Sequence, residues 1–244
     1  MDLNCKNISN RNKNNDKNLF IKNLSLELAN TINGLDGFLN LFNKNNLSER
    51  EKELLCQAKY ATFILSYQVK SLKHLQELEN ATPQINFICF NLCELISNSL
   101  SFFKKEFLHK KINISFDNDP NTPLFLYGDS LKLNEIINSL IENSFILASN
   151  YINFYTKIIK KENEKITINF KLIFDTTSIK KEPQNNFIFD NLTATSEFKK
   201  TDINFALSNE LLKQLNSQLF YDTEEKEIII SFDITFFNNN QEQM

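Results

Sequence analysis

The stretch that decides the fold is "NLSLELANTINGLDGF", residues 23–38. In and around it, apolar residues follow a heptad repeat with two series offset by three residues: Ile21, Leu28, Leu35 and Phe42, and Leu24, Thr31 and Phe38. This repeat is typical of a helix that packs along a narrow seam against other helices. Leu26 falls outside the repeat, at a position that faces away from the seam, where a polar side chain is usual.

A second helix is predicted to begin after "NKNN" at 43–46 interrupts the repeat. Ser48 and Glu51 have the spacing of a capping box, and the helix after them runs to about Glu79. It carries a matching apolar stripe: Leu54, Ala58, Ala61, Leu65, Leu72 and Leu75. The short loop makes the two helices antiparallel neighbours. Because one hairpin buries little apolar surface, we expect it to pair with a second copy into a four-helix bundle.

An α+β pattern follows Pro83. It has short strands at 85–90, 112–116 and 123–127, and amphipathic helices at 92–111 and 130–149, the second capped by Asp129. A polar connection leads to a long alternating strand at 165–175, an undefined loop at about 176–200, a helix at 202–216 and a closing hairpin at 218–237. We therefore predict an α+β fold in which helices cover one face of a mixed, mostly antiparallel sheet.

The domain boundaries follow from these patterns and from polar ends. We predict a disordered tail at 1–17, a helical hairpin at 18–80, an α+β domain at 85–237 and a polar tail at 238–244. Acidic and basic residues nearly balance, 30 against 27, so no nucleic-acid partner is expected. The sequence has no signal peptide and no apolar run that could span a bilayer, so we expect a cytoplasmic protein without a membrane partner. The scattered cysteines predict no metal site.

Four blocks of sequence, in order, resemble the catalytic core of sensor histidine kinases. The first helix of that family reads N-x-S-H-E-L-R-T-P-L-N; here Ser25, Glu27, Leu28 and Asn33 match, and Leu26 stands where the family has its phosphoacceptor histidine. The second block, G-D-x-x-R-L-x-Q-I-L-x-N-L-x-x-N-A-x-K-F-T, resembles residues 128–147. There Asn143 is kept, Ser139 replaces the first asparagine, and Ile146 replaces the lysine that faces the phosphates.

The third and fourth blocks are the nucleotide loops. The adenine-reading block D-T-G-I-G-I resembles the start of residues 175–192, where Asp175 is kept but both glycines are replaced, by Thr177 and Ile179. The block G-L-G-L-A-I-x-x-x-L-V aligns with residues 202–212, with Asp202 and Asn204 at its glycines. The resemblance covers about residues 19–237. It implies a dimerisation hairpin joined to an α/β sandwich of the histidine kinase ATPase type.

The replaced residues imply that the family's chemistry is absent. Leucine has no lone pair, so Leu26 cannot accept a phosphoryl group. Glycines allow a backbone to approach phosphates closely, and none of the four survives; the carboxylate of Asp202 would also repel a nucleotide. Ser139, Asn143 and Asp175 are then only the remnant of a nucleotide site. We expect no catalytic residue, no ATP or Mg²⁺ cofactor, and no enzymatic activity.

What remains is a hypothesis of docking. The resemblance implies a catalytically inactive homodimer that acts as a scaffold for the receiver domain of a response regulator. Its expected contact residues lie at and beyond the degenerate phosphoacceptor pair Leu26–Glu27: Leu26, Asn30, Asn33 and Phe38. The alternative from another class is a residual histidine kinase or phosphotransferase that uses His74 as a non-standard acceptor. A purely structural relic is a third possibility that the sequence leaves open.

Overall fold

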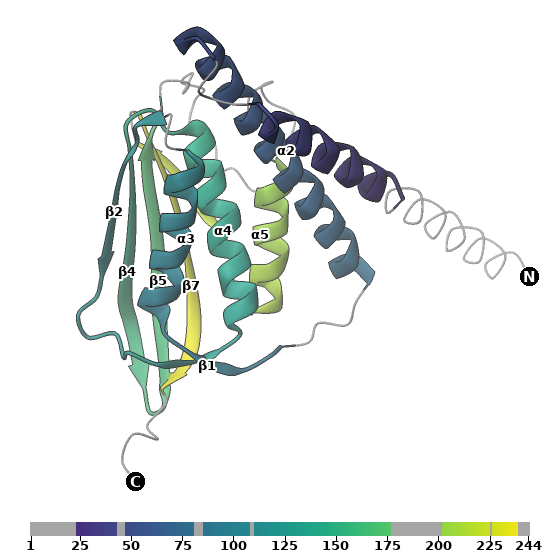
Figure 1. Ribbon diagram of the computed structural model, residues 1–244. Helices are drawn as coiled ribbons and strands as arrows, with labels where there is room; N and C mark the ends of the chain where they lie inside the picture. The colour runs from purple at the N-terminus through teal and green to yellow at the C-terminus, as the bar shows by residue number, and fades with distance from the viewer. Residues whose placement is uncertain are drawn as a thin grey trace, which may run out of the picture. The chain divides into compact units, whose positions relative to one another are not determined.

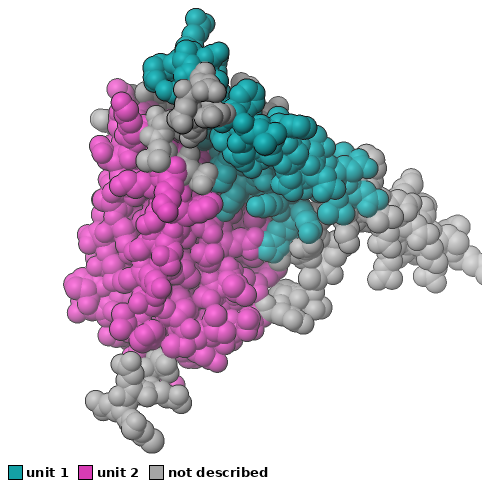
Figure 2. Space-filling model, in the orientation of Figure 1, with its two compact units in different colours: residues 1–82 teal, residues 83–244 magenta. Residues whose placement is uncertain are grey.

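A computed structural model describes residues 23–42, 47–80, 85–107, 110–176, 202–224 and 226–238. The predicted tail at 1–17, almost all of the undefined loop and all but the first residue of the predicted C-terminal tail lie outside these ranges. The chain divides into two compact units, Met1–Thr82 and Pro83–Met244, coloured separately in Figure 2. Each unit is described by itself.

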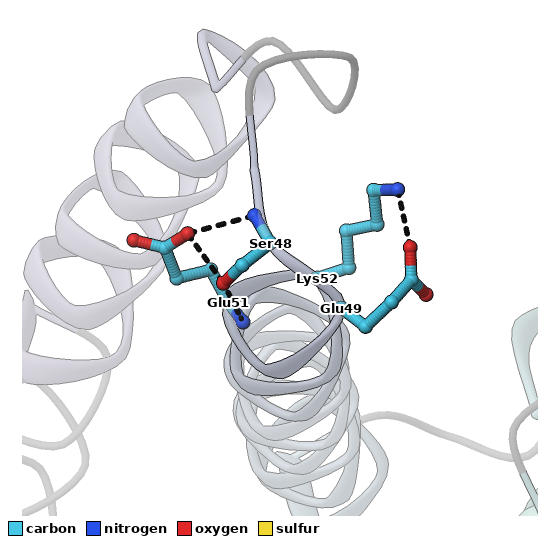
Figure 3. Close-up of polar contacts among 4 residues, drawn as sticks. All are labelled: Ser48, Glu49, Glu51 and Lys52. Atoms are coloured by element: carbon cyan, nitrogen blue, oxygen red, sulfur yellow. Dashed lines mark hydrogen bonds and ion pairs between the residues drawn. The ribbon is translucent and has the colours of Figure 1, made fainter.

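The first unit is built from two helices. The first helix covers described residues 23–40, and α2 spans Glu49–Asn80. Figure 3 shows the predicted capping box, which is confirmed: the Ser48 backbone N–H and hydroxyl donate to Glu51 Oε2 over 2.8 and 2.6 Å. The Glu51 N–H donates back to Ser48 Oγ over 3.4 Å. Lys59 Nζ of α2 donates to Asn40 Oδ1 of the first helix over 2.5 Å and links the two helices.

The face that each helix buries differs from the predicted seam. In the described part of this unit the buried positions include Ser25 and Ile32 on the first helix, and Leu55, Thr62 and Val69 on α2, spaced by seven residues within each helix. The predicted seam is exposed instead, from 37% for Leu28 to 69% for Phe38. Within the single chain the two helices therefore bury a different face from the predicted seam, because heptad spacing alone does not tell which face the neighbouring helix covers.

The second unit contains a seven-stranded mixed sheet. Six strands follow the order β1-β3-β7-β5-β4-β2, and β6 also pairs with β7. Their bounds are β1 Ile88–Phe90, β2 Asn113–Asn118, β3 Leu126–Gly128, β4 Tyr151–Glu162, β5 Lys165–Asp175, β6 Phe220–Glu224 and β7 Glu227–Asn238. Among the strand pairs that the structure describes, only β2–β4 is parallel; the others are antiparallel. The predicted α+β fold with a mostly antiparallel sheet is confirmed.

Three helices cover one face of this sheet: α3 Leu92–Glu106, α4 Ser130–Leu147 and α5 Asp202–Gln214 (Figure 1). Strict alternation points every second side chain of β5 and β7 toward the helices. On β5 these are Ile166, Ile168, Phe170, Leu172 and Phe174, all at most 2% exposed. Phe170 stacks on Phe232 of β7 with ring centroids 4.8 Å apart. The core therefore lies between the sheet and the three helices.

Two predicted boundaries of the second unit were wrong. The polar connection predicted before residue 165 is the twelve-residue strand β4. Its buried series is short, Ile152, Phe154 and Thr156, and its lysine-rich second half hides the alternation. The helix predicted at 92–111 ends at Glu106, and Lys111 has a left-handed φ of 51°. Among the helices described, none combines the length and apolarity needed to cross a membrane.

Candidate functional site: a buried polar seam between two helices

The helix that carries most of the site, α4, is held at both ends. At its start Asp129 Oδ1 accepts the Lys132 N–H over 3.0 Å, as the sequence predicts, and Oδ2 accepts the Asn86 N–H over 3.0 Å and Lys132 Nζ over 3.0 Å. At its end Lys110 Nζ donates to the carbonyls of Phe145 and Ile146, each over 2.7 Å. Both helix ends are thereby satisfied by side chains, which fixes α4 on the sheet.

Five buried polar residues lie along the contact between α4 and α5, and we call them the α4–α5 polar seam: Ser139, Glu142 and Asn143 of α4, and Asn204 and Ser208 of α5. Each is at most 2% exposed. Asn204 Nδ2 donates to Glu142 Oε2 over 2.7 Å and to Asn143 Oδ1 over 3.3 Å. The seam therefore brings the predicted remnant pair Ser139 and Asn143 into one cluster with residues of α5.

The direction of the helices arranges the seam in two layers. Ser149, just after α4, donates its backbone N–H to the carbonyl of Asp175, and Asp175 pairs with Glu227, the first residue of β7. Helix α4 therefore ends near the start of β7. Ser217, just after α5, donates its hydroxyl to the carbonyl of Asp233, which lies further along β7. Helix α5 therefore ends away from the start of β7. The helices thus run antiparallel. Asn204 lies at the level of Asn143, and Ser208, one turn on, lies at the level of Ser139, one turn back.

Most polar atoms of the seam lack a hydrogen-bond partner among the described residues. These atoms are Ser139 Oγ, Glu142 Oε1, Asn143 Nδ2, Asn204 Oδ1 and Ser208 Oγ. Buried polar groups are normally paired, because leaving one unpaired costs about 1–3 kcal/mol. Burial raises the pKa of Glu142 to about 8, and the hydrogen bond from Asn204 opposes this only in part. A buried carboxyl with a raised pKa among several unpaired polar atoms makes the α4–α5 polar seam a candidate functional site.

Asp175, the third predicted remnant of the nucleotide site, has a different set of partners. Its carboxylate accepts the N–H groups of Asn150 and Tyr151 over 2.8 and 2.9 Å and the Asn150 side-chain amide over 2.5 Å. Burial alone would raise its pKa, but these donors outweigh burial and hold the pKa below its usual value. In this arrangement the carboxylate fastens the turn between α4 and β4.

The glycine replacements can be placed only in part. Asn204 puts a side chain, rather than a hydrogen atom, against Glu142 and Asn143. Its neighbour Phe205 is 4% exposed, and Asp202 is the first residue of α5. Ile146 is half-buried on α4. Thr177 and Ile179 lie outside the described residues.

The predicted docking residues all lie on the first helix, but not on one face. Leu26 is 44% exposed, and Glu27, Asn30 and Asn33 are exposed as well. At about 100° per residue, Asn33 and Asn30 lie within about 20° and 40° of Leu26, whereas Phe38 lies about 120° away. Phe38 instead shares the exposed stripe of the predicted seam. His74 is half-buried on α2.

Sequence reasoning missed Glu142, Asn204 and Ser208 as members of a site. Two signals were present: the acidic residue Glu142 on a helix whose neighbouring positions are apolar or uncharged, and the four-residue spacing of Asn204 and Ser208, which puts them on one helix face. Only the packing of α5 on α4 joins the two signals. In the described stretches no three His, Cys, Asp or Glu side chains gather as they would around a metal ion.

Comparisons with known proteins point to one class. No family model matches the chain. It is 22% identical over 174 residues to the peroxide stress-activated histidine kinase mak3 of Schizosaccharomyces pombe, covering 70% of this chain and 7% of that protein. It is 27% identical over 128 residues to the sensor histidine kinase GacS of Pseudomonas protegens, covering 52% of this chain and 14% of that protein. The chain spans only 6–14% of the length of these and the other similar curated proteins.

Solved structures of histidine kinases have a similar fold. The histidine kinase AdeS of Acinetobacter baumannii has a TM-score of 0.56 at 18% identity, over 88% of this chain and 98% of that chain. Full-length ShkA in complex with AMPPNP has a TM-score of 0.63 at 14% identity, over 89% of this chain and 46% of that chain. The chain therefore has a histidine-kinase-like core. Its second unit has the mixed α+β fold of the histidine kinase ATPase type.

Proposed function

We propose that the chain is a catalytically inactive histidine-kinase-like protein of two-component signalling, acting in the cytoplasm as a dimeric docking module for a response-regulator receiver domain. The observation that carries the proposal is Leu26. Its side chain stands at the position that the resemblance assigns to the phosphoacceptor, is 44% exposed, and has no atom that could take a phosphoryl group.

The nucleotide half of the proposal rests on the α4–α5 polar seam. Asn143, the residue kept from the family's second block, is fully buried and bonded to Asn204. A nucleotide would have to displace Asn204 to reach the side-chain oxygen of Asn143. We therefore expect neither ATP nor Mg²⁺ to act as a cofactor.

The dimer half of the proposal rests on the exposed apolar stripes of the first unit. Large apolar side chains that a single chain leaves 37–69% exposed run along both helices: Leu24, Leu28, Leu35, Phe38, Phe42, Leu54 and Leu65. A contiguous exposed stripe of this kind is a protein–protein contact in most soluble proteins. A second copy that presents the same stripes would complete a four-helix bundle.

The docking proposal is tested with the purified chain and a panel of receiver domains. Light scattering is expected to give a dimer at micromolar concentration, and titration calorimetry is expected to find at least one receiver domain that binds. Leu26→Glu should weaken that binding by about tenfold or more, since it puts a charge into an apolar contact. Ile159→Glu is the matched control, because Ile159 is a similarly exposed apolar residue on β4 and its change should leave the affinity unaltered.

Radiolabelled ATP with Mg²⁺ distinguishes docking from catalysis. No acid-labile label is expected on the chain, alone or with the receiver domain. Label that disappears in His74→Gln would overturn the proposal in favour of a residual kinase or phosphotransferase. A monomer that binds no receiver domain of the panel would overturn the docking function itself.

A further inference from the structure

In the α4–α5 polar seam, the carboxyl group of Glu142 and the side-chain amide of Asn204 form a pair in which only one polar atom of each group is hydrogen-bonded. Glu142 is 0% exposed and Asn204 is 2% exposed. Asn204 Nδ2 donates to Glu142 Oε2 over 2.7 Å. The second oxygen of each group, Glu142 Oε1 and Asn204 Oδ1, has no partner among the described residues.

One proton accounts for both unpaired oxygens. An ionised carboxylate only accepts hydrogen bonds. Glu142 Oε1 and Asn204 Oδ1 would then both be acceptors, with no donor between them. A carboxylic acid has one O–H donor. A proton on Oε1 makes Glu142 a donor at the oxygen that lacks a partner, and Asn204 Oδ1 is an acceptor of the same pair that also lacks one.

The surroundings favour the neutral acid. Burial is the main cause of the raised pKa of Glu142, and no charged side chain is among its causes. On its own helix the nearest titratable residues in sequence are Glu135 and Lys132, seven and ten positions away. The titratable side chains that the structure describes on the helices and the short strand packed against α4 are Cys89 of β1, Cys93, Glu94, Lys104 and Lys105 of α3, and Glu210 and Lys213 of α5. None of them supplies a counter-charge to the Glu142 carboxylate.

We propose that the acid–amide pair of Glu142 and Asn204 is a proton-dependent latch, which holds α5 against α4 and keeps Ser139 and Asn143 closed to ligands. When Glu142 loses its proton to solvent, the carboxylate faces the amide oxygen without a donor between them. The pair then loses one hydrogen bond and gains a buried charge. Rehydration of that charge favours separation of α5 from α4.

The pH range of the latch follows from its two states. In the opened state Glu142 meets water and has the usual carboxyl value of 4.5, whereas in the closed state its pKa is about 8. Because the closed state binds the proton more tightly, closure is strongest below about 4.5 and weakens as pH rises. Opening should increase by about tenfold per pH unit up to about 8 and level off above it.

Hydrogen exchange of the whole chain tests the latch. Backbone amides of residues 205–214 in α5 are followed between pH 5.5 and 9, corrected for the intrinsic pH dependence of exchange, with the amides of β5 as the reference for global opening. Wild-type α5 should lose about tenfold protection per pH unit up to about pH 8, while β5 should not. Glu142→Gln keeps a neutral pair with Asn204 and should remove this dependence. Glu210→Gln, the matched change on the exposed side of α5, should retain it.

A second measurement needs no variant and covers the case in which Glu142→Gln does not fold. The side-chain carboxyl carbon of Glu142 in the wild-type chain should titrate in a ¹³C NMR spectrum with a midpoint near 8. A midpoint near 4.5, or equal pH dependence of α5 in wild type and Glu142→Gln, would overturn the latch. Neither result bears on the dimer or on receiver binding, so the docking proposal is decided separately.

Discussion

The two units of this chain use apolar residues in opposite ways. In the second unit most of the large apolar side chains of β5, β7 and α4 are buried, and the aromatic rings of Phe170 and Phe232 stack inside the core. In the first unit most large apolar residues of the described first helix are exposed, and Ile32 is the one large apolar side chain buried there. The second unit therefore buries an apolar core within a single chain, whereas the hairpin leaves most of the apolar surface of its first helix exposed.

The comparison also separates two kinds of candidate site. In the hairpin, Leu26 lies on an exposed surface, at the position that the resemblance assigns to the phosphoacceptor. In the second unit Ser139 and Asn143 are buried instead, and Asn204 of α5 donates a hydrogen bond to Asn143. An exposed surface remains available to a partner protein, while a closed seam requires a movement before anything can bind.

The largest effect is expected for a core truncation in the second unit. Phe170→Ala should lower the free energy of unfolding by about 3–5 kcal/mol, because it leaves a cavity at a fully buried ring. Urea denaturation followed by circular dichroism measures the change. Phe38→Ala in the exposed stripe is the control and should cost less than about 1 kcal/mol per protomer under conditions that keep the chain monomeric. Equal losses would contradict the comparison between the units.

The next largest effect concerns association. The double change Leu28→Lys and Leu35→Lys puts two charges on the exposed stripe and should raise the dimer dissociation constant by about a hundredfold, or about 3 kcal/mol. Concentration-dependent light scattering measures it. Lys157→Glu on the outer face of β4 is a charge change outside the stripe and should leave the dissociation constant unaltered. A dimer that survives the double change would place its interface elsewhere.

A smaller effect is expected at the cap of α4. Asp129→Ala should cost about 1–2 kcal/mol at pH 7, because Lys132 and Asn86 lose their acceptor. Burial alone would raise the pKa of Asp129, but the N–H donors of Lys132 and Asn86 outweigh it and hold the pKa below its usual value. This stability is present above the usual value of 3.8 and is lost as pH falls through the lowered pKa. Urea titrations at pH 7 and at pH 2.5 should show the cost of Asp129→Ala shrinking in acid. A cost that does not change between these two pH values would contradict the role of the ionised carboxylate.

The smallest effect is expected at the capping box of α2. Ser48→Ala removes the hydroxyl that accepts the Glu51 N–H and should lower hairpin stability by about 1 kcal/mol. Glu49→Ala is the matched control, since its ion pair with Lys52 is exposed on the same first turn and is worth little. Thermal melting of both variants compares them. A larger loss in the control would show that the ion pair rather than the cap starts the helix.

The elements that sequence patterns predicted well are those set by neighbouring residues. The capping box of Ser48 and Glu51, the cap at Asp129 and the strand at 165–175 depend on contacts within a few positions or on strict alternation. The resemblance to histidine kinases depended on residues at fixed spacing, and comparison with known proteins agrees with it. Leu26 was recognised as exposed for the same reason, since helix periodicity alone predicts which side faces away from the seam.

Sequence by itself determined most of the order of elements, the caps at Ser48 and Asp129, and the presence of Leu26 at the position that the resemblance assigns to the phosphoacceptor, because these depend on local geometry and residue identity. Only the tertiary structure decided which stripe of the hairpin is buried, that residues 151–162 form a strand, and that Glu142 meets Asn204. The physical reason is the same in each case. Burial and pKa depend on what an element packs against, and the partner of Glu142 comes from a helix sixty-two residues further along the chain.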